Sequence, residues 1–301
     1  MNQDGLFAGL RAAVPRGTVL REEPMRRHTS FRIGGPAEFY VQPSGEAELL
    51  SAIRFLRRVG QRYAVIGNGT NLLVNDAGIR GVVIEVGRGL SAVRIQDTAV
   101  TAEAGILLSR LANAVLEHGL SGLEFAAGIP GSLGGAVVMN AGAYGGEMKD
   151  VVVCTRYFDG NTGEVREITG DAHQFGYRKS VFGAGDVVLS AQMELSHGGK
   201  AEIEALMKEL NQRRKDKQPI ELPSAGSTFK RPEGQFAGKL IADAGLAGYR
   251  VGGACVSEKH CGFVVNDKNA TCADVQRLME HIQQEVYRQF GVLLQPEVRV
   301  L

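Results

Sequence analysis

A glycine-rich stretch in the middle of the chain limits the possible folds more than any other feature. Residues 128–135 read GIPGSLGG, and residues 139–146 read MNAGAYGG. So many glycines around one proline cannot form a stable helix and make a poor strand. Glycine also permits positive φ angles and lets the backbone approach a ligand closely, so consecutive N–H groups can face one anion. The stretch therefore predicts a loop that binds phosphate groups.

A second loop of the same kind lies upstream. Residues 67–71 read GNGTN and directly follow the apolar run 63–66. Two such loops on separate segments indicate a dinucleotide held between two lobes, because a pyrophosphate needs several N–H donors. Turns in an all-β region are the alternative for either loop taken singly, since short motifs also match by chance.

The better-known nucleotide motifs do not fit either loop. A P-loop requires Lys and then Ser or Thr after its last glycine, and neither loop has them. Residues 87–92, GRGLSA, match the Rossmann fingerprint and follow the strand-like residues 82–86. That fingerprint must open a helix, whereas residues 93–96 and 99–104 alternate like a β-hairpin. We therefore interpret this match as chance.

Composition narrows the class of protein. The chain has 301 residues, of which 44% are hydrophobic, and its net charge is +1. It is long enough for roughly two or three compact cores. No basic stripe predicts nucleic-acid binding, no apolar run reaches membrane-spanning length, and the start lacks a secretion signal. We expect a cytoplasmic enzyme that binds neither nucleic acid nor a membrane.

The cysteines and histidines do not suggest a metal site. The cysteines are few, lack C-x-x-C spacing and have no accompanying histidine cluster; they are Cys154, Cys255, Cys261 and Cys272. We expect reduced thiols and no bound metal.

The pattern along the chain predicts three parts. The first, 1–86, has a loosely packed leader up to about residue 20 and then a small α/β lobe. In that lobe a helix capped by Ser44 runs to about Val59 between strands at 39–41, 63–66 and 82–86. The second part, 87–196, consists mainly of short strands with one helix near 107–117.

The third part, 197–301, begins with a polar helix over about 200–217. Thr271 and Asp274 form a capping-box pattern at the start of a strongly amphipathic helix. Residues 292–301 read as a strand that places Glu297 and Arg299 on one face. Besides this pair, residues 177–180 and 224–230 are polar groupings that could carry chemistry. Taken singly, each grouping is equally consistent with an exposed turn, a Ser-rich loop or a solvated charge pair.

Taken in order, these motifs resemble one family. They are HTSFRIGG (28–35), GNGTNLLV (67–74), AGIPGSLGG (127–135), NAGAY (140–144), YRKS (177–180), AGSTFKRP (225–232) and PEVR (296–299). The chain is similar to UDP-N-acetylenolpyruvoylglucosamine reductases from about residue 22 onward. The resemblance implies an α+β chain with a two-lobed FAD-binding fold of the vanillyl-alcohol-oxidase type, followed by a C-terminal α/β substrate-binding domain.

The resemblance also implies an activity and its residues. FAD would relay hydride from NADPH to the enolpyruvyl group of UDP-N-acetylglucosamine-enolpyruvate, giving UDP-N-acetylmuramate for peptidoglycan. Ser227 matches the proton donor, and Arg178 and Glu297 match the residues that polarise the substrate carboxylate. Glu297 would act as a neutral acid if burial raises its pKa. The FAD contacts carry over onto Asn68, Gly69, Thr70, Asn71, Gly128, Ile129, Gly131, Ser132, Arg178 and Arg299.

The chain departs from the longer members of the family in one respect. Between Ser180 and Lys217 it has no insertion with a tyrosine loop that folds over the uridine diphosphate. The polar candidates for that contact are Lys217, Arg231, Tyr249, Arg250, Lys259 and His260, each of which could equally be a surface residue.

Two other functions stay open. The chain could be an FAD-dependent oxidase of the same superfold acting on an alcohol or sugar. Such enzymes often hold flavin through a His or Cys, and neither occurs in 63–76 or 126–146. A non-catalytic nucleotide-binding module is the second alternative, but such a module would not need Arg178, Ser227 and Glu297.

Overall fold

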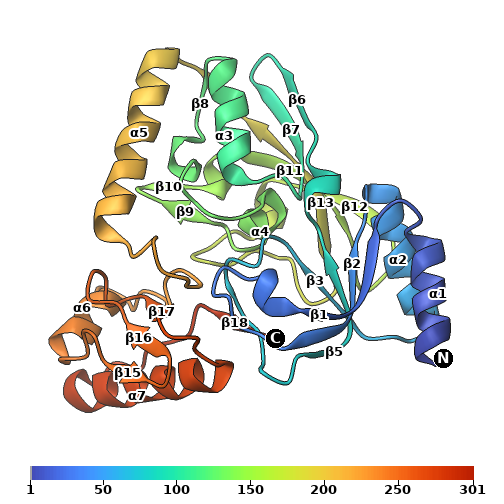
Figure 1. Cartoon of the computed structure of the whole chain (residues 1–301). Helices are drawn as coiled ribbons and strands as arrows, with labels where there is room; N and C mark the ends of the chain where they lie inside the picture. The colour runs from blue at the N-terminus through green and yellow to red at the C-terminus, as the bar shows by residue number, and fades with distance from the viewer. Residues whose placement is uncertain (1) are drawn as a thin grey trace. The chain divides into compact units, whose positions relative to one another are not determined.

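The computed structural model describes residues 2–301 and divides into two compact units (Figure 1). Unit 1 contains the residues up to Arg21, Phe39–Asn68 and Gly81–Arg213. Unit 2 contains Glu22–Glu38, Gly69–Arg80 and Arg214–Leu301. The predicted boundaries after residues 86 and 196 stay predictions.

The N-terminal residues are not the loosely packed leader that the sequence suggests. Helix α1 (Gln3–Ala13) is capped by the Asn2 side chain and packs against α2 (Glu46–Arg58). Leu6 and Leu10 are buried in the core of unit 1. The spacing of these two leucines, one helical turn apart, places them on one face, and that face supplies the packing.

The first sheet has the strand order β1-β2-β5-β3. Its strands are β1 (Thr18–Pro24), β2 (Pro36–Gln42), β3 (Tyr63–Ile66) and β5 (Ile79–Glu85). Strands β3 and β5 are parallel, and α2 supplies a buried face that includes Leu49, Ile53 and Leu56. Strand, helix, strand and glycine loop therefore follow one another as predicted.

The start of α2 differs from the prediction, because Gly45 rather than Ser44 is the N-cap residue. Gly45 offers no side-chain cap, and the Glu48 carboxylate instead anchors the residues that precede the helix. It accepts hydrogen bonds from the backbone N–H of Ser44 at 2.8 Å and of Arg16 at 2.9 Å. Burial alone would raise the pKa of Glu48, but the hydrogen bonds from Ser44 and Arg16 outweigh it and lower the pKa to about 2.

The second sheet is antiparallel and has the order β12-β11-β13-β7-β6. Its strands are β6 (Val93–Gln96), β7 (Ala99–Glu103), β11 (Val152–Phe158), β12 (Val165–Thr169) and β13 (Val187–Glu194). The predicted hairpin is β6–β7, and the Rossmann-like stretch opens only a 3₁₀ turn, Arg88–Leu90. Helix α3 (Leu108–Glu117) confirms the predicted helix.

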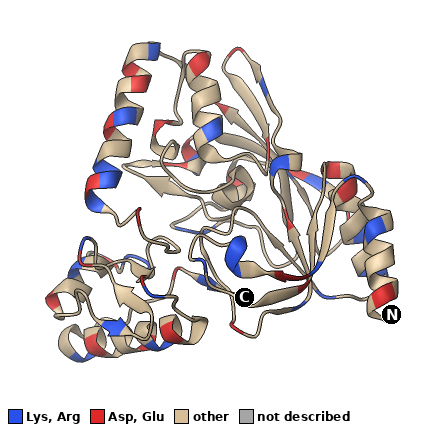
Figure 2. Ribbon diagram, viewed as in Figure 1, with Lys and Arg blue, Asp and Glu red and all other residues tan. Residues whose placement is uncertain are grey.

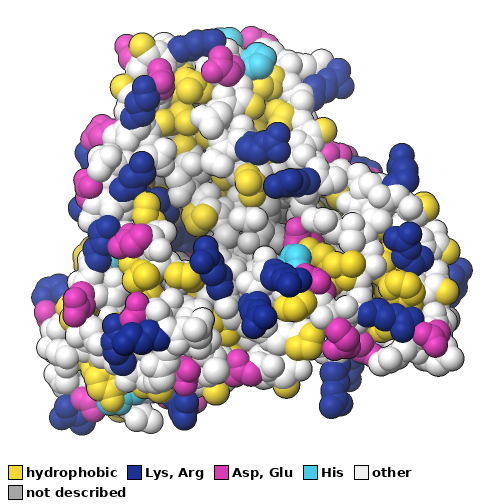
Figure 3. All heavy atoms as spheres, in the orientation of Figure 1, with side chains coloured by type: hydrophobic (Ala, Val, Ile, Leu, Met, Phe, Trp, Pro, Cys, Tyr) yellow, Lys and Arg dark blue, Asp and Glu magenta, His cyan; other side chains and the backbone are white. Residues whose placement is uncertain are grey.

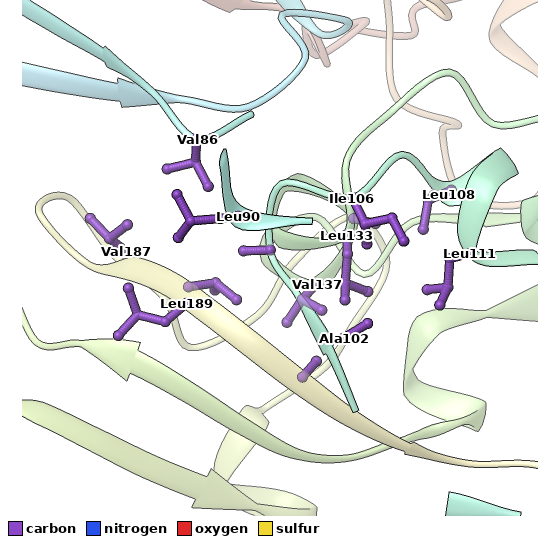
Figure 4. Close-up of a cluster of buried hydrophobic side chains, with 14 of the residues drawn as sticks. Val86, Leu90, Ala102, Ile106, Leu108, Leu111, Leu133, Val137, Val187 and Leu189 are labelled. Carbon is purple, nitrogen blue, oxygen red and sulfur yellow. The ribbon is translucent and has the colours of Figure 1, made fainter. Parts of the chain in front are cut away.

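A short helix, α4 (Leu133–Val138), packs on this sheet. The prediction that the stretch 128–135 forms no helix is wrong for its last residues, because Gly134 and Gly135 lie in the first turn of α4. Gly134 packs there against Ala104, too closely for a Cβ. Figure 4 shows Leu133 and Val137 of α4 close to Leu189 and Ala102 in the core. The smaller elements of the chain are β4 (Leu72–Leu73), β8 (Leu120–Ser121), β9 (Gly142–Ala143), β10 (Gly146–Glu147), β14 (Ser196–His197) and the 3₁₀ turns Met25–Arg27, Glu124–Ala126, Met148–Asp150 and Gly170–His173.

Helix α5 (Lys200–Lys217) carries basic and acidic side chains along its length (Figure 2), and only Ile203, Met207 and Leu210 are buried. Side chains of both signs are also scattered over the face of the molecule in Figure 3. No helix in residues 2–301 is both long enough and apolar enough to cross a membrane.

Unit 2 is built around one long helix, α7 (Cys272–Phe290). The other elements are α6 (Ala237–Asp243), β15 (Arg250–Val251), β16 (Ala254–Val256), β17 (Val264–Asn266) and β18 (Arg299–Val300). The predicted capping box of Thr271 and Asp274 is present at the start of α7. The Asp76 carboxylate also accepts the first N–H groups of α7, from Cys272 at 2.7 Å and Ala273 at 3.0 Å. A segment far from α7 in sequence therefore completes its N-terminus.

The prediction of a continuous strand over 292–301 is wrong. Only Arg299–Val300 forms a strand, which pairs in parallel with β4, and Pro296 makes an isolated bridge with Phe229. Leu294 instead packs into the core beside α7, whose Gln283 side chain donates to its carbonyl at 2.7 Å. A proline cannot donate to a ladder, so pairing is interrupted there.

Candidate functional site

The first glycine loop begins where β3 ends, beside β5. The N–H groups of Asn68, Gly69, Thr70 and Asn71 find no hydrogen-bond acceptor among the described residues. Gly69 has φ +62°, and a Cβ there would collide with the His28 carbonyl oxygen. Only glycine fits such a position, and the result is a row of consecutive donors available to an anion.

The second glycine loop lies in unit 1 between the 3₁₀ turn Glu124–Ala126 and α4. Its backbone is fixed by two bonds to the start of α3: Leu108 N–H donates to Gly131 and Leu133 N–H donates to Ile106, both at 2.9 Å. Ser132 is the N-cap residue of α4, but its side chain caps no N–H group. The N–H groups of Gly128 and Ser132 likewise have no acceptor within residues 2–301.

The two glycine loops touch each other in unit 1. A Cβ at Gly67 would collide with the Oγ of Ser132, which is 3% exposed. Within unit 1 this contact places the N–H group of Asn68 and the N–H groups of Gly128 and Ser132 on neighbouring loops. Such donors fit the pyrophosphate of a dinucleotide cofactor, which they can bind without a nucleophilic side chain.

Arg178 lies on a tight two-residue turn, also in unit 1. Gly176 and Lys179 exchange backbone hydrogen bonds at 3.0 and 3.2 Å, so Tyr177 and Arg178 form the turn. Arg178 has φ +53°, a conformation that L residues rarely adopt. Its Nη2 donates to the Gly142 carbonyl at 3.0 Å. Both its backbone and its guanidinium are therefore held in place.

Ser227 is exposed between residues that are firmly anchored in unit 2. Its neighbour Thr228 is 2% exposed, donates through its N–H to Gly262 at 2.8 Å, and accepts the Val264 N–H on its Oγ1 at 2.9 Å. Gly226 precedes with φ +76°. The Ser227 hydroxyl makes no hydrogen bond to any described residue, so it is free to face a ligand.

The irregular segment 295–301 brings several predicted residues together within unit 2. Glu297 N–H donates to Thr228 at 2.9 Å, and Arg299 N–H donates to Asn71 at 3.0 Å. The Asn71 side chain donates to the Glu297 carbonyl at 3.2 Å. Val298 between them is buried, whereas Glu297 is half-buried and Arg299 is exposed. Asn71, Glu297 and Arg299 thus lie beside the Ser227 loop, whereas Arg178 belongs to unit 1.

Three of the six candidates for substrate contact already interact with neighbouring side chains. Arg250 forms an ion pair with Asp267 at 2.5 Å, and Tyr249 stacks on His281 with ring centroids 4.4 Å apart. Arg231 lies over the ring of the exposed Phe236 at 4.6 Å. These contacts give all three candidates structural partners in unit 2.

Of the remaining three candidates, only His260 is linked to the Ser227 loop, through Gly262, whose carbonyl accepts the Thr228 N–H. Lys217 is exposed at the end of α5. Lys259 reaches back to that helix end, where its Nζ donates to the Lys215 carbonyl at 2.6 Å. The half-buried His260 accepts the Gly262 N–H on Nδ1 at 3.1 Å, and burial lowers its pKa. His260 therefore has a fixed neutral tautomer with Nε2–H as donor.

Two structural residues escaped sequence reasoning. Asp76 caps α7 from a distant segment, and Asn140 lies buried beside the Arg178 turn. The motif NAGAY (140–144) was the only sequence signal for Asn140, and it does not state a contact. No group of three or more His, Cys, Asp or Glu side chains in the described part of the chain could hold a metal ion.

Comparison with known proteins defines the class. Residues 37–198, which contain both glycine loops, match the family model described as FAD binding domain. The chain is therefore an FAD-binding protein with a separate C-terminal region. Residues 218–301 match the model described as UDP-N-acetylenolpyruvoylglucosamine reductase, C-terminal domain. The chain belongs to the UDP-N-acetylenolpyruvoylglucosamine reductase family.

Full-length relatives agree with this assignment. The chain is 50% identical to the reductase of Caldanaerobacter subterraneus over 293 residues, covering 97% of this chain and 96% of the relative. It is 47% identical to that of Clostridioides difficile over 302 residues, covering 100% and 99%. Among solved structures, the reductase of Thermus caldophilus matches with a TM-score of 0.80 and 35% identity, covering 95% of this chain and 98% of that one.

A more distant likeness concerns the fold alone. A variant of berberine bridge enzyme matches with a TM-score of 0.51 at 17% identity, covering 65% of this chain and 44% of that chain. The predicted α+β fold, with a two-lobed FAD-binding region of the vanillyl-alcohol-oxidase type and a C-terminal domain, is confirmed.

Proposed function

We propose that this protein is a cytoplasmic flavoenzyme that uses NADPH to reduce the enolpyruvyl group of UDP-N-acetylglucosamine-enolpyruvate, giving UDP-N-acetylmuramate for peptidoglycan synthesis. The observation that carries the proposal is the family match, which extends over nearly the whole chain and includes the C-terminal domain specific to these reductases. The anchored Ser227 loop with Glu297 beside it supports the same reaction.

The binding roles follow from the donor groups. The N–H groups of Asn68, Gly69, Thr70 and Asn71, with those of Gly128 and Ser132, would hold the FAD pyrophosphate; Ile129 and Gly131 would line the second loop. When bound, FAD supplies hydride transfer between NADPH and the terminal vinyl carbon of the substrate. Arg299, tied through its backbone to Asn71, would lie near the flavin.

The catalytic roles follow from the charge that develops on the substrate. When a hydride adds to the vinyl carbon of this enol ether, the electron pair of the double bond moves toward the α-carbon and its carboxylate. The permanently charged Arg178, and Glu297 acting as a neutral hydrogen-bond donor, would stabilise that carboxylate. The Ser227 hydroxyl would then give its proton to the α-carbon and regain one from solvent. One hydride and one proton are thus added across the bond, and one NADPH is oxidised.

The substrate contacts remain candidates of two kinds. Lys217, Lys259 and His260 carry donors that would suit the uridine diphosphate, and His260 is linked through Gly262 to the Ser227 loop. Arg231, Tyr249 and Arg250 are already engaged with neighbouring side chains, so their contribution would be secondary.

A coupled assay tests the proposal directly. Purified protein is mixed with NADPH under anaerobic conditions, with and without the enolpyruvyl substrate. We expect NADPH oxidation only when the substrate is present, with one product per NADPH that is heavier by two hydrogens in mass spectrometry. The alternative oxidase would instead consume oxygen with an alcohol or sugar and leave the enolpyruvyl compound unchanged.

A further inference from the structure

Asn140 is a buried polar residue that the proposed mechanism does not use. It is 0% exposed, follows the end of α4, and has φ +41°. Asparagine tolerates this left-handed conformation better than most residues. A fully buried amide in such a backbone position must have its polar atoms satisfied locally.

Both the nitrogen and the oxygen of its amide are hydrogen-bonded, and the partners lie on two other segments. Nδ2 donates to Oε2 of Glu147 at 2.9 Å and to the Gly176 carbonyl at 3.0 Å. Oδ1 accepts the backbone N–H of Lys149 at 2.9 Å. One side chain therefore joins the segment after α4, the segment 147–149 and the Arg178 turn.

The bond to Gly176 concerns Arg178 directly. Gly176 is the first residue of the two-residue turn, so its carbonyl is one of the two atoms that close it. The guanidinium is tied to the same neighbourhood, because it donates to Gly142, two residues after Asn140. The backbone turn that carries Arg178 is therefore hydrogen-bonded to Asn140, and its guanidinium is hydrogen-bonded to Gly142 in the same segment.

The charged groups around this network favour the same arrangement. Lys149 lies 2.9 Å from the Glu147 carboxylate. The pKa of Glu147 is lowered, first by the hydrogen bond from Lys149, then by Asn140 and by the positive charge of Arg178. Glu147 therefore stays ionised and accepts the Asn140 amide, which fixes the orientation of that amide.

We propose that Asn140 is a positioning residue for Arg178: its amide holds the turn that carries the guanidinium in the geometry required by the substrate carboxylate. The inference rests on the role of Arg178 in the proposed function. A displacement of about 1 Å at a catalytic group can cost roughly a hundredfold in rate.

Asn140→Asp tests this at nearly constant shape. The variant keeps an acceptor for Lys149 N–H, loses both donors, and places a second carboxylate against Glu147. We expect FAD to stay bound and NADPH to reduce it at a rate within about threefold of wild type, while reoxidation by the enolpyruvyl substrate falls about ten- to hundredfold. Lys149→Met is the matched control, because it removes the ion pair with Glu147 but leaves the three hydrogen bonds of Asn140, so any loss that it causes measures the ion pair alone.

A double-mutant cycle with Arg178→Lys separates positioning from general structural damage. If Asn140 acts through Arg178, the two losses in reoxidation rate should not multiply, because the second change has no positioned guanidinium left to disturb. Losses that multiply would overturn the inference, as would an equal slowing of both half-reactions. Should Asn140→Asp fail to bind FAD, Asn140→Gly, which accommodates the positive φ, is measured with the same expectation.

The control outcomes distinguish this inference from the proposed function. Wild-type protein that the enolpyruvyl substrate cannot reoxidise would refute both. Normal wild-type turnover and an impaired Arg178→Lys, together with an Asn140→Asp variant that reoxidises at the wild-type rate, would refute only the role of Asn140.

Discussion

Two adjacent hydroxyls, Ser227 and Thr228, should respond in opposite ways to substitution. The Ser227 hydroxyl is exposed and has no hydrogen-bond partner among the described residues, so Ser227→Ala should change the free energy of unfolding by no more than about 0.5 kcal/mol. The Thr228 hydroxyl is buried and accepts the Val264 N–H at 2.9 Å. Thr228→Val leaves that N–H without an acceptor and should cost about 1–3 kcal/mol.

The expected effects on the reaction rate are the reverse of those on stability: Ser227→Ala should lose activity and Thr228→Val should keep most of it. A proton donor acts only after the flavin is reduced, so Ser227→Ala should let NADPH bleach the flavin at near-normal speed. Reoxidation by the enolpyruvyl substrate should fall by about 10²–10⁴, or further if no water replaces the hydroxyl. Thr228→Val should retain most of its reoxidation rate in spite of its lower stability, because the backbone bond from Thr228 to Gly262 remains.

Stopped-flow absorbance of the flavin, recorded separately with NADPH and with substrate, measures the two half-reactions. Urea unfolding of the same preparations measures stability. If Ser227→Ala slows both half-reactions equally, or lowers stability as much as Thr228→Val does, Ser227 is a structural loop residue and the mechanism loses its proton donor.

Three further outcomes are expected. Acid precipitation should release yellow FAD into the supernatant, because backbone N–H groups rather than a nucleophile contact it; flavin retained in the pellet would revive a covalent oxidase. Gly69→Ala should weaken FAD binding in a fluorescence titration and lower the melting temperature, since its Cβ would collide with His28 and its φ is +62°; unchanged values would contradict the loop geometry. Because the pKa of Glu48 is lowered from 4.5 to about 2, its contribution to stability is complete above pH 4.5 and is lost as the pH falls through 2. The difference in unfolding free energy between wild type and Glu48→Gln should therefore shrink over that range, and a difference independent of pH would refute the assignment.

Local patterns in the sequence predicted much of the fold. The capping box at Thr271 and the hairpin at 93–103 are present, because each depends on residues a few positions apart. The α2 cap was predicted wrongly for the opposite reason. Gly45 is the N-cap residue without a side-chain cap, and the Glu48 carboxylate accepts the backbone N–H groups of Ser44 and of Arg16, which is 32 residues earlier in the chain.

In the site, too, features that depend on nearby residues were predicted and features that depend on distant contacts were not. The first glycine loop was recognisable because Gly69 has a positive φ that favours glycine. In the second loop no glycine of 128–135 has a positive φ, and close packing, as at Gly134 against Ala104, accounts for glycine instead. The segment around Glu297 was predicted as a regular strand, yet its position depends on separate bonds to Thr228 and Asn71, which no periodicity encodes. The role of Asn140 could not be predicted from the sequence either, because its hydrogen-bond partners lie 7, 9 and 36 positions away.

The discontinuous make-up of unit 2 has a consequence for recombination between relatives. Its core includes Phe31 and Leu73, and the α7 N-terminus is completed by Asp76, although the C-terminal family model covers only residues 218–301. A gene fragment cut at that boundary would encode a helix without part of its cap and a core without several of its side chains. Chimaeras that exchange the C-terminal portion between two reductases should therefore be viable only when residues 22–38 and 69–80 travel with it. The set of residues that must be exchanged together is therefore larger than the region that the C-terminal family model covers.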